Sequence, residues 1–172
     1  GSGMRGENAR RGAARPGNAW RIFGWILLIV YVCVIYGHSL TPADLSSQES
    51  GFVLRVCRGV LAGLGLESAW LTEHMVRKTA HFVEYAGLGV LLAVNFRPWK
   101  GAGRPAPRGF WTRIRGALEL ALAVPFGDET IQLFVEGRSG QISDVWLDMS
   151  GALCGLAAAC LLGMGLKRRE FP

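Results

Sequence analysis

The sequence has few charges, few cysteines and none of the short motifs that mark the common enzyme classes. Only 19% of its 172 residues are Asp, Glu, Lys or Arg, against about 25% in a typical soluble domain. Its four cysteines form no C-x-x-C or zinc-finger spacing, so we expect them to pack as small apolar side chains. No G-x-S-x-G, P-loop or H-E-x-x-H motif occurs, so nucleotide use and zinc-peptidase chemistry have no support.

Long apolar segments are what the chain has in abundance. Half of its residues are hydrophobic, and 24 are glycines, which let transmembrane helices approach closely. Four segments are long enough to cross a bilayer: 20–36, 79–96, 116–135 and 142–166. A shorter one, 52–66, carries two arginines and is better suited to an amphipathic helix at the membrane surface. The predicted fold is an all-α integral membrane bundle of about four transmembrane helices plus this interfacial helix.

We divide the chain into one membrane domain and two short tails. Residues 1–19 form a basic tail predicted to be disordered, and its first three residues, before Met4, resemble a vector-derived remnant. Residues 20–166 form the transmembrane domain, and 167–172 form a second basic tail. A signal peptide also begins with basic residues and a short apolar run. However, residues 36–39 offer no small-x-small cleavage site, so we expect a retained first helix.

The distribution of Lys and Arg predicts the orientation in the membrane. The N-terminal tail, a Pro/Gly-rich loop at 97–115 and the C-terminal tail together hold 14 of the 19 basic residues. With four crossings these segments share one side, which the positive-inside rule makes cytoplasmic. Ten of the 13 acidic residues fall on the other side. We therefore expect a cytoplasmic (inner) membrane protein with both termini inside. Orientation and anionic lipid then account for the net charge of +6 without a nucleic-acid partner.

Polar side chains gather at the predicted extracytoplasmic ends of the helices. Charges beside hydrocarbon are costly and usually serve a task. Residues four apart share a helix face, which places Asp128 with Gln132 and Asp144 with Asp148. We interpret the group as a functional cluster, although a structural ion-pair network is the alternative for any one member. The cluster comprises Lys78, His81, Glu84, Asp128, Glu129, Gln132, Arg138, Asp144 and Asp148.

Two local patterns make further predictions. Gly151-x-x-x-Gly155 places small residues on one face of the last span, so a neighbouring helix should pack closely there. Pro125 and Gly127 interrupt the third span just before Asp128 and are expected to distort that helix.

Three motifs together resemble the VanZ-like family of small membrane proteins. They are Lys78-x-x-His81-Phe82-x-Glu84-Tyr85, Asp128-Glu129-x-x-Gln132 and Gly137-Arg138-Ser139-Gly140-x-x-x-Asp144-x-x-x-Asp148-x-x-Gly151. The resemblance covers roughly residues 25–166. It implies a multi-helix membrane protein linked to the bacterial cell envelope, in a family whose namesake is associated with reduced sensitivity to teicoplanin. It implies no agreed reaction, so the mechanism has to be argued from residues.

Catalysis is the first hypothesis for the cluster. Carboxylates with few histidines suit Mg²⁺ or Mn²⁺, and Asp128, Asp144 and Asp148 are the expected ligands. His81, Glu84 and Glu129 join these three as candidate catalytic groups, since His and carboxylates can act as acid or base. Candidate substrate-binding residues are Lys78, Tyr85, Gln132, Arg138 and Ser139, with Arg and Lys suited to phosphate. Such a site would make the protein a hydrolase or transferase for a lipid-linked envelope precursor or a phospholipid headgroup.

A second hypothesis is a non-enzymatic module that binds or shields a lipid or a peptidoglycan precursor with the same residues. Transport is less favoured, because the polar groups lie at one end of the predicted bundle instead of along a span.

Overall fold

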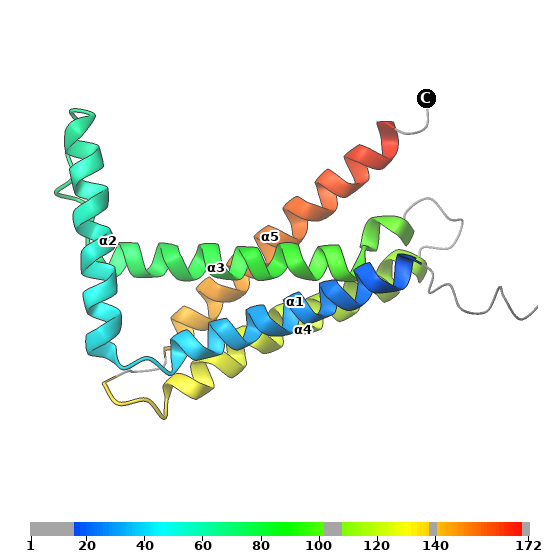
Figure 1. The fold of residues 1–172 in the computed structure, drawn as a ribbon, viewed down its shortest axis with the longest axis horizontal. Helices are drawn as coiled ribbons and strands as arrows, with labels where there is room; N and C mark the ends of the chain where they lie inside the picture. The colour runs from blue at the N-terminus through cyan, green and yellow to red at the C-terminus, as the bar shows by residue number, and fades with distance from the viewer. Residues whose placement is uncertain (1–15, 102–107, 138–140, 170–172) are drawn as a thin grey trace, which may run out of the picture.

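The computed structural model describes residues 16–101, 108–137 and 141–169. Within these ranges every regular element is helical, which confirms the all-α class. Figure 1 shows their arrangement. The elements are α1 (Pro16–Ser39), α2 (Ala43–Gly63), α3 (Glu73–Phe96), the short 3₁₀ helix η2 (Pro98–Gly101), α4 (Arg108–Gln132) and α5 (Ile142–Arg169).

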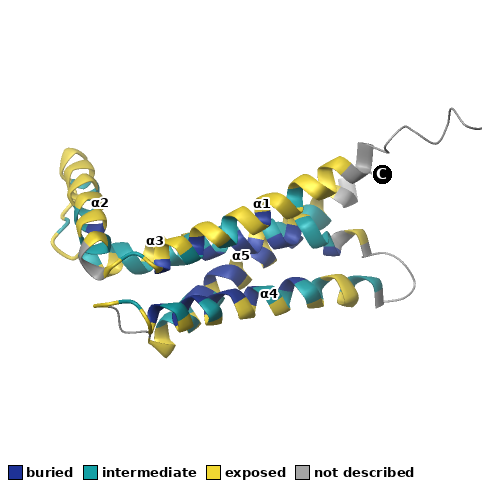
Figure 2. Cartoon of the chain, turned by 60° about the horizontal axis from the view of Figure 1, so that its bottom comes forward, coloured by how far each residue is buried: buried dark blue, intermediate teal, exposed yellow. Residues whose placement is uncertain are grey.

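Four long helices make the body of the molecule, and α2 stands apart from them. Helices α1 and α4 run beside α3, while α5 crosses α3 obliquely and forms with it the most extensive helix pair. Helix α2 meets only the beginning of α3 and projects steeply away from the bundle (Figure 1). Buried residues lie on the inner sides of α3, α4 and α5, whereas α1 and α2 are largely exposed (Figure 2).

Three helices have the length and apolar composition needed to cross a membrane. They are found within α1, α3 and α5, at Ala19–Ser39, Glu73–Phe96 and Ile142–Leu166. Helix α4 has comparable length, but four of its first twelve residues are charged, and it is not among the candidate spans in the described ranges. Large apolar side chains on α1, including Ile22, Phe23 and Ile29, are exposed, as expected of a helix that faces lipid.

Glycines bring the backbones of α3 and α5 into direct contact. A Cβ atom added to Gly89, Gly151 or Gly155 would collide with backbone atoms of the opposite helix: those of Ala152, Phe82 and Ala86, respectively. The predicted close approach at Gly151 and Gly155 is therefore confirmed. Because no side chain separates the helices there, the spacing of residues near this contact is fixed by the backbone.

Several helix boundaries differ from the prediction. Helix α4 begins at Arg108, so the last eight residues of the predicted 97–115 loop are helical. Helix α2 begins at Ala43, directly after Pro42, nine residues before the predicted start, because its polar first turns offered no apolar signal. Helix α3 begins at Glu73, where the Thr72 side chain caps it by accepting a hydrogen bond from the backbone N–H of Met75 at 3.2 Å.

The tails are also more helical than predicted. Helix α1 includes residues 16–19 of the predicted disordered tail, and α5 continues to Arg169. The rest of the first tail, 1–15, and residues 170–172 lie outside the described ranges.

Helix α4 continues through Pro125 and Gly127, so these residues do not end the helix, and the predicted distortion stays a prediction. Proline removes one helical hydrogen bond, but packing around this turn holds the helix together. The Tyr36 hydroxyl of α1 reaches across and donates a hydrogen bond to the carbonyl of Val124 at 3.3 Å. Gly127 leaves room for that approach, since a Cβ there would lie 2.5 Å from the Tyr36 hydroxyl oxygen.

Candidate functional site

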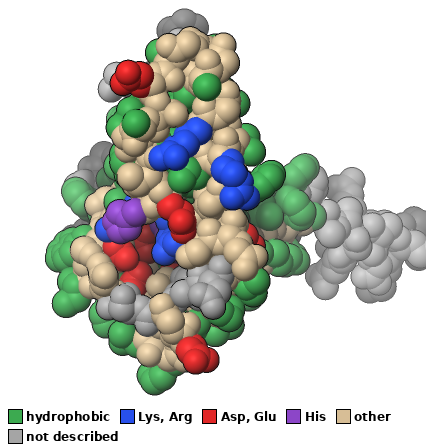
Figure 3. All heavy atoms as spheres, turned by 90° about the vertical axis from the view of Figure 1, so that its left-hand side faces the viewer, with side chains coloured by type: hydrophobic (Ala, Val, Ile, Leu, Met, Phe, Trp, Pro, Cys, Tyr) green, Lys and Arg blue, Asp and Glu red, His purple; other side chains and the backbone are tan. Residues whose placement is uncertain are grey.

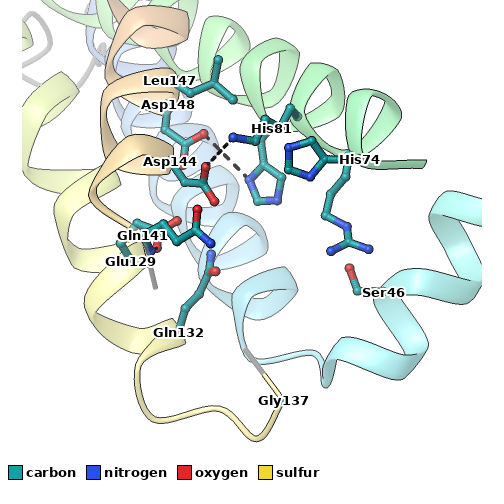
Figure 4. Close-up of a pocket in the computed structure, with 12 residues that line it drawn as sticks. Ser46, His74, His81, Glu129, Gln132, Gly137, Gln141, Asp144, Leu147 and Asp148 are labelled. Carbon is teal, nitrogen blue, oxygen red and sulfur yellow. Dashed lines mark hydrogen bonds and ion pairs between the residues drawn. The ribbon is translucent and has the colours of Figure 1, made fainter. Parts of the chain in front are cut away.

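The ends of four helices enclose a polar pocket at the end of the bundle next to α2. Its volume is about 180 Å³. Figure 3 looks onto this end and shows acidic, histidine and basic side chains around a hollow, and Figure 4 shows the lining residues. The polar pocket is lined by Ser46, His74, Arg77, Lys78, His81, Glu129, Gln132, Gly137, Gln141, Asp144, Leu147 and Asp148.

Asp148 is the most unusual member of this lining. It is 1% exposed, and neither carboxylate oxygen has a hydrogen-bond partner among the described residues. Its ion-pair contact with Nδ1 of His81 is long, at 3.9 Å (Figure 4). A buried carboxylate without hydrogen bonds is costly, which makes Asp148 the first candidate in this lining for a functional role.

Asp128 lies beside Asp148 but is held by neighbours. It is fully buried. Its Oδ1 accepts a hydrogen bond from the Ser39 hydroxyl, and its Oδ2 accepts one from Nε2 of Gln132 at 3.4 Å. The same Nε2 also donates to the Ser39 hydroxyl at 3.3 Å. Ser39 is the last residue of α1, so this network fastens α1 to α4 and fixes the orientation of the Asp128 carboxylate.

His81, Asp128 and Asp148 form a group that could hold a metal ion. One ligand atom from each lies within 4.8 Å of the other two. Asp144 is placed differently from the predicted ligand set, because its Oδ1 forms an ion pair with Nζ of Lys78 at 3.0 Å (Figure 4). The structure thus groups His81 with the two buried carboxylates and leaves Asp144 at the rim.

Two other predicted residues have separate surroundings. Glu129 is 6% exposed and lines the polar pocket, where its Oε2 accepts a hydrogen bond from the backbone N–H of Gln141 at 3.1 Å. Glu84 points elsewhere: its Oε1 contacts Nδ1 of His38 at 3.0 Å, outside the polar pocket.

Tyr85 is fully buried, and its hydroxyl lies within electrostatic reach of both Asp128 and Asp148. Arg138 and Ser139 fall outside the described residues.

Sequence reasoning missed several members of the site. Ser39 orients Asp128, while His74, Arg77 and Ser46 line the polar pocket. A usable signal existed for Arg77, which directly precedes Lys78, and for Ser39, which ends an apolar run at the same predicted membrane face. Ser46 gave no such signal, since it lies within a polar stretch.

A comparison with protein families tests the family membership that the motifs suggest. The family model described as VanZ/LLP1 matches residues 23–163, which covers most of the chain. The chain belongs to the VanZ/LLP1 family. No curated protein and no solved structure shows a significant match.

In this VanZ/LLP1 chain, the matched region contains every residue that lines the polar pocket. Two carboxylates and one imidazole are a donor set that suits a hard divalent cation when the carboxylates dominate. The residues therefore fit a divalent cation.

Proposed function

We propose that the protein is a divalent-cation-dependent hydrolase or transferase that acts on a phosphate-bearing lipid headgroup at the extracytoplasmic membrane face. The substrate is a lipid-linked envelope precursor or a phospholipid. The observation that carries the proposal is Asp148, a buried carboxylate with two unpartnered oxygens in the lining of a pocket that also contains basic side chains. A cation between Asp148, Asp128 and His81 would balance the buried charge and polarise a phosphate oxygen.

The remaining lining residues supply the other parts of such a site. Lys78 and Arg77 provide positive charge at the rim, where Lys acts as a point charge and Arg as a fork for phosphate oxygens. The ion pair of Lys78 with Asp144 is one-third exposed, so a phosphate can compete for the ammonium at modest cost.

Glu129 is the carboxylate left for proton transfer. In the hydrolytic version a water oxygen attacks phosphorus, and the water's proton passes to Glu129. The bond from phosphorus to the leaving oxygen breaks, and the leaving oxygen takes up a proton. In the transfer version an acceptor hydroxyl replaces the water. A reaction that consumes an envelope lipid is also compatible with the altered teicoplanin sensitivity that the family resemblance implies.

We place the polar pocket outside the cell by proposing α4 as a fourth crossing. Helix α4 contacts α1, α3 and α5, so leaving it out of the bilayer would separate packed helices. The positive-inside rule then puts η2 in the cytoplasm.

A cysteine replacing Lys100 should resist an impermeant thiol reagent in intact cells, while one replacing Glu136 should react. Labelling of Lys100→Cys without labelling of Glu136→Cys would indicate the opposite orientation in the membrane.

The proposed reaction is tested with purified protein in lipid extract, with EDTA or with Mg²⁺, and with the lipids followed by mass spectrometry. We expect a product that needs Mg²⁺ and is absent with His81→Ala. Asp144→Ala should lower turnover by releasing Lys78 from its fixed position. Glu119→Gln, near the middle of α4 and outside the polar pocket, is the matched control and should leave turnover intact. A lipid that co-purifies unchanged under all conditions would instead favour the binding module.

A further inference from the structure

A second, larger cleft adjoins the polar pocket. It lies between α2 and the first half of α3 and has a volume of about 680 Å³, well within the range of roughly 300–1,000 Å³ typical of small-molecule sites. Away from the polar pocket its lining includes polar residues, Glu49 and Glu84 among them, but most of its surface is apolar. The apolar residues are Val53, Cys57, Leu71, Val76, Ala80 and Val83. We call this the α2–α3 cleft.

The two cavities are adjacent. Ser46, Arg77 and His81 line both of them. The junction is polar and cationic, whereas Ala80 and Val83 lead down α3 toward the middle of the bundle. A headgroup followed by a hydrocarbon chain shows the same change from polar to apolar along its length.

Polar contacts join α2 to the first turns of α3 and to the segment that precedes α3. Near the start of α2, Ser47 accepts a hydrogen bond from Nη2 of Arg77 at 3.1 Å. Near its end, Nη2 of Arg58 donates to the carbonyl of Leu71 at 2.7 Å. The intervening face contributes Val53 and Cys57 to the cleft, and the rest of the described chain covers these side chains only in part. Between Ser46 and Cys57 this face extends about 16 Å.

We propose that the α2–α3 cleft holds a hydrocarbon chain of the same lipid whose phosphate-bearing headgroup occupies the polar pocket. This inference rests on the proposed function and names its substrate class: an anionic membrane lipid recognised through its headgroup and through one chain. Helix α2 then serves as a wall of the substrate site. Arg77 stands where the phosphate meets the chain. Its ion pair with Glu73 at 2.9 Å is partly exposed, so an anionic headgroup can compete for the guanidinium at modest cost.

Photolabelling in nanodiscs of phosphatidylcholine tests the proposal. The probe is phosphatidic acid with a diazirine in one acyl chain, and adducts are mapped by peptide mass spectrometry. We expect adducts to concentrate on residues 53–57 and 76–83. An excess of unlabelled phosphatidic acid should remove them, and added phosphatidylcholine should not.

Variants of α2 sharpen the test. Cys57→Trp fills the cleft and should lower this labelling by about tenfold or more, as overpacking of a bound chain predicts. Val53→Phe is a milder second variant. Val56→Trp is the matched control, because Val56 is exposed and does not line the cleft. Even labelling of all lipid-exposed helices, or equal labelling of Cys57→Trp and Val56→Trp, would overturn the proposal. So would disulfide cross-linking of two copies through Cys57.

The control measurement separates this proposal from the proposed function. Mn²⁺ binding to the variants is followed by electron paramagnetic resonance, and turnover is measured with dihexanoyl phosphatidic acid, whose chains are too short to fill the cleft. Loss of long-chain labelling with normal Mn²⁺ binding and short-chain turnover supports the cleft as the chain site. Absence of Mn²⁺ binding and turnover in the unmodified protein would refute the proposed function, whatever the labelling pattern.

Discussion

Charged side chains are buried at one end of the helical bundle and exposed toward the other. At the pocket end, Asp128 and Asp148 are almost completely buried. At the opposite end, Arg115 and Glu119 form an ion pair at 2.7 Å with side chains that are 81% and 62% exposed. Exposed pairs contribute little to stability, and the positive-inside rule is enough to explain basic residues there. Buried carboxylates are costly, so their presence at the pocket end motivates the proposed cation site.

The largest effect should come from Asp148→Asn, which keeps the shape of the side chain and removes its charge. We expect loss of turnover and of Mn²⁺ binding. The metal-free variant should also melt at a higher temperature than the metal-free parent, because a buried charge has been removed. In the parent, Mn²⁺ at one hundred times its Kd adds about 2.7 kcal/mol to the unfolding free energy. Thermal unfolding with and without Mn²⁺ measures both effects.

A purely structural role for Asp148 predicts a different pattern. Asp148→Asn would then lower the melting temperature of the metal-free protein, and Mn²⁺ would stabilise neither form. That result would mean that the buried carboxylates at the pocket end, like the exposed ion pair at the opposite end of the bundle, have no role in metal binding.

A smaller effect is expected from Ser39→Ala. The variant removes the hydroxyl that orients Asp128, and losing such a supporting contact typically weakens metal binding by about 10–100-fold. Mn²⁺ titration followed by electron paramagnetic resonance measures the change. Ser150→Ala is the matched control, because that exposed hydroxyl bonds only to the carbonyl of Trp146 in its own helix. Equal affinities in the two variants would contradict the assigned role of Ser39.

The smallest effect is expected from Arg115→Ala at the opposite end. Its partner is Glu119, one turn away in the same helix, and both are solvent-exposed. We expect no measurable change in melting temperature, Mn²⁺ affinity or turnover, since single surface ion pairs are weak. A clear loss of turnover would mean that the opposite end takes part in function.

The sequence predicted the all-α class and the meeting of distant polar residues in one place, because both follow from hydropathy and from counting crossings. It did not predict which carboxylate would stand beside His81. Asp144 and Asp148 share one helix face, so spacing treats them alike. The rotation of α5 against α3 separates them, and this depends on the contact at Gly151. The helical start of α4 was also hidden, because Arg108 and its neighbours resemble a polar loop.

Ser39 shows a further limit of sequence reasoning. A serine at the end of an apolar helix is unremarkable until the partner helix is placed beside it. Only the fold brings its hydroxyl to a carboxylate 89 residues away.

The glycine contact between α3 and α5 also has a consequence for ionic size. Asp148 lies three residues before Gly151, and His81 directly precedes Phe82, whose carbonyl oxygen meets Gly151. With no side chain between the helices, the width of the proposed cation site is set by backbone contact. A single methyl group, in Gly151→Ala, should move the ligands apart and favour Ca²⁺, whose ligand distances are about 2.3–2.6 Å, over Mg²⁺ at about 2.0–2.1 Å. Competition of Ca²⁺ and of Mg²⁺ with bound Mn²⁺, measured in the parent and in Gly151→Ala, would show whether this glycine determines which ion binds more tightly.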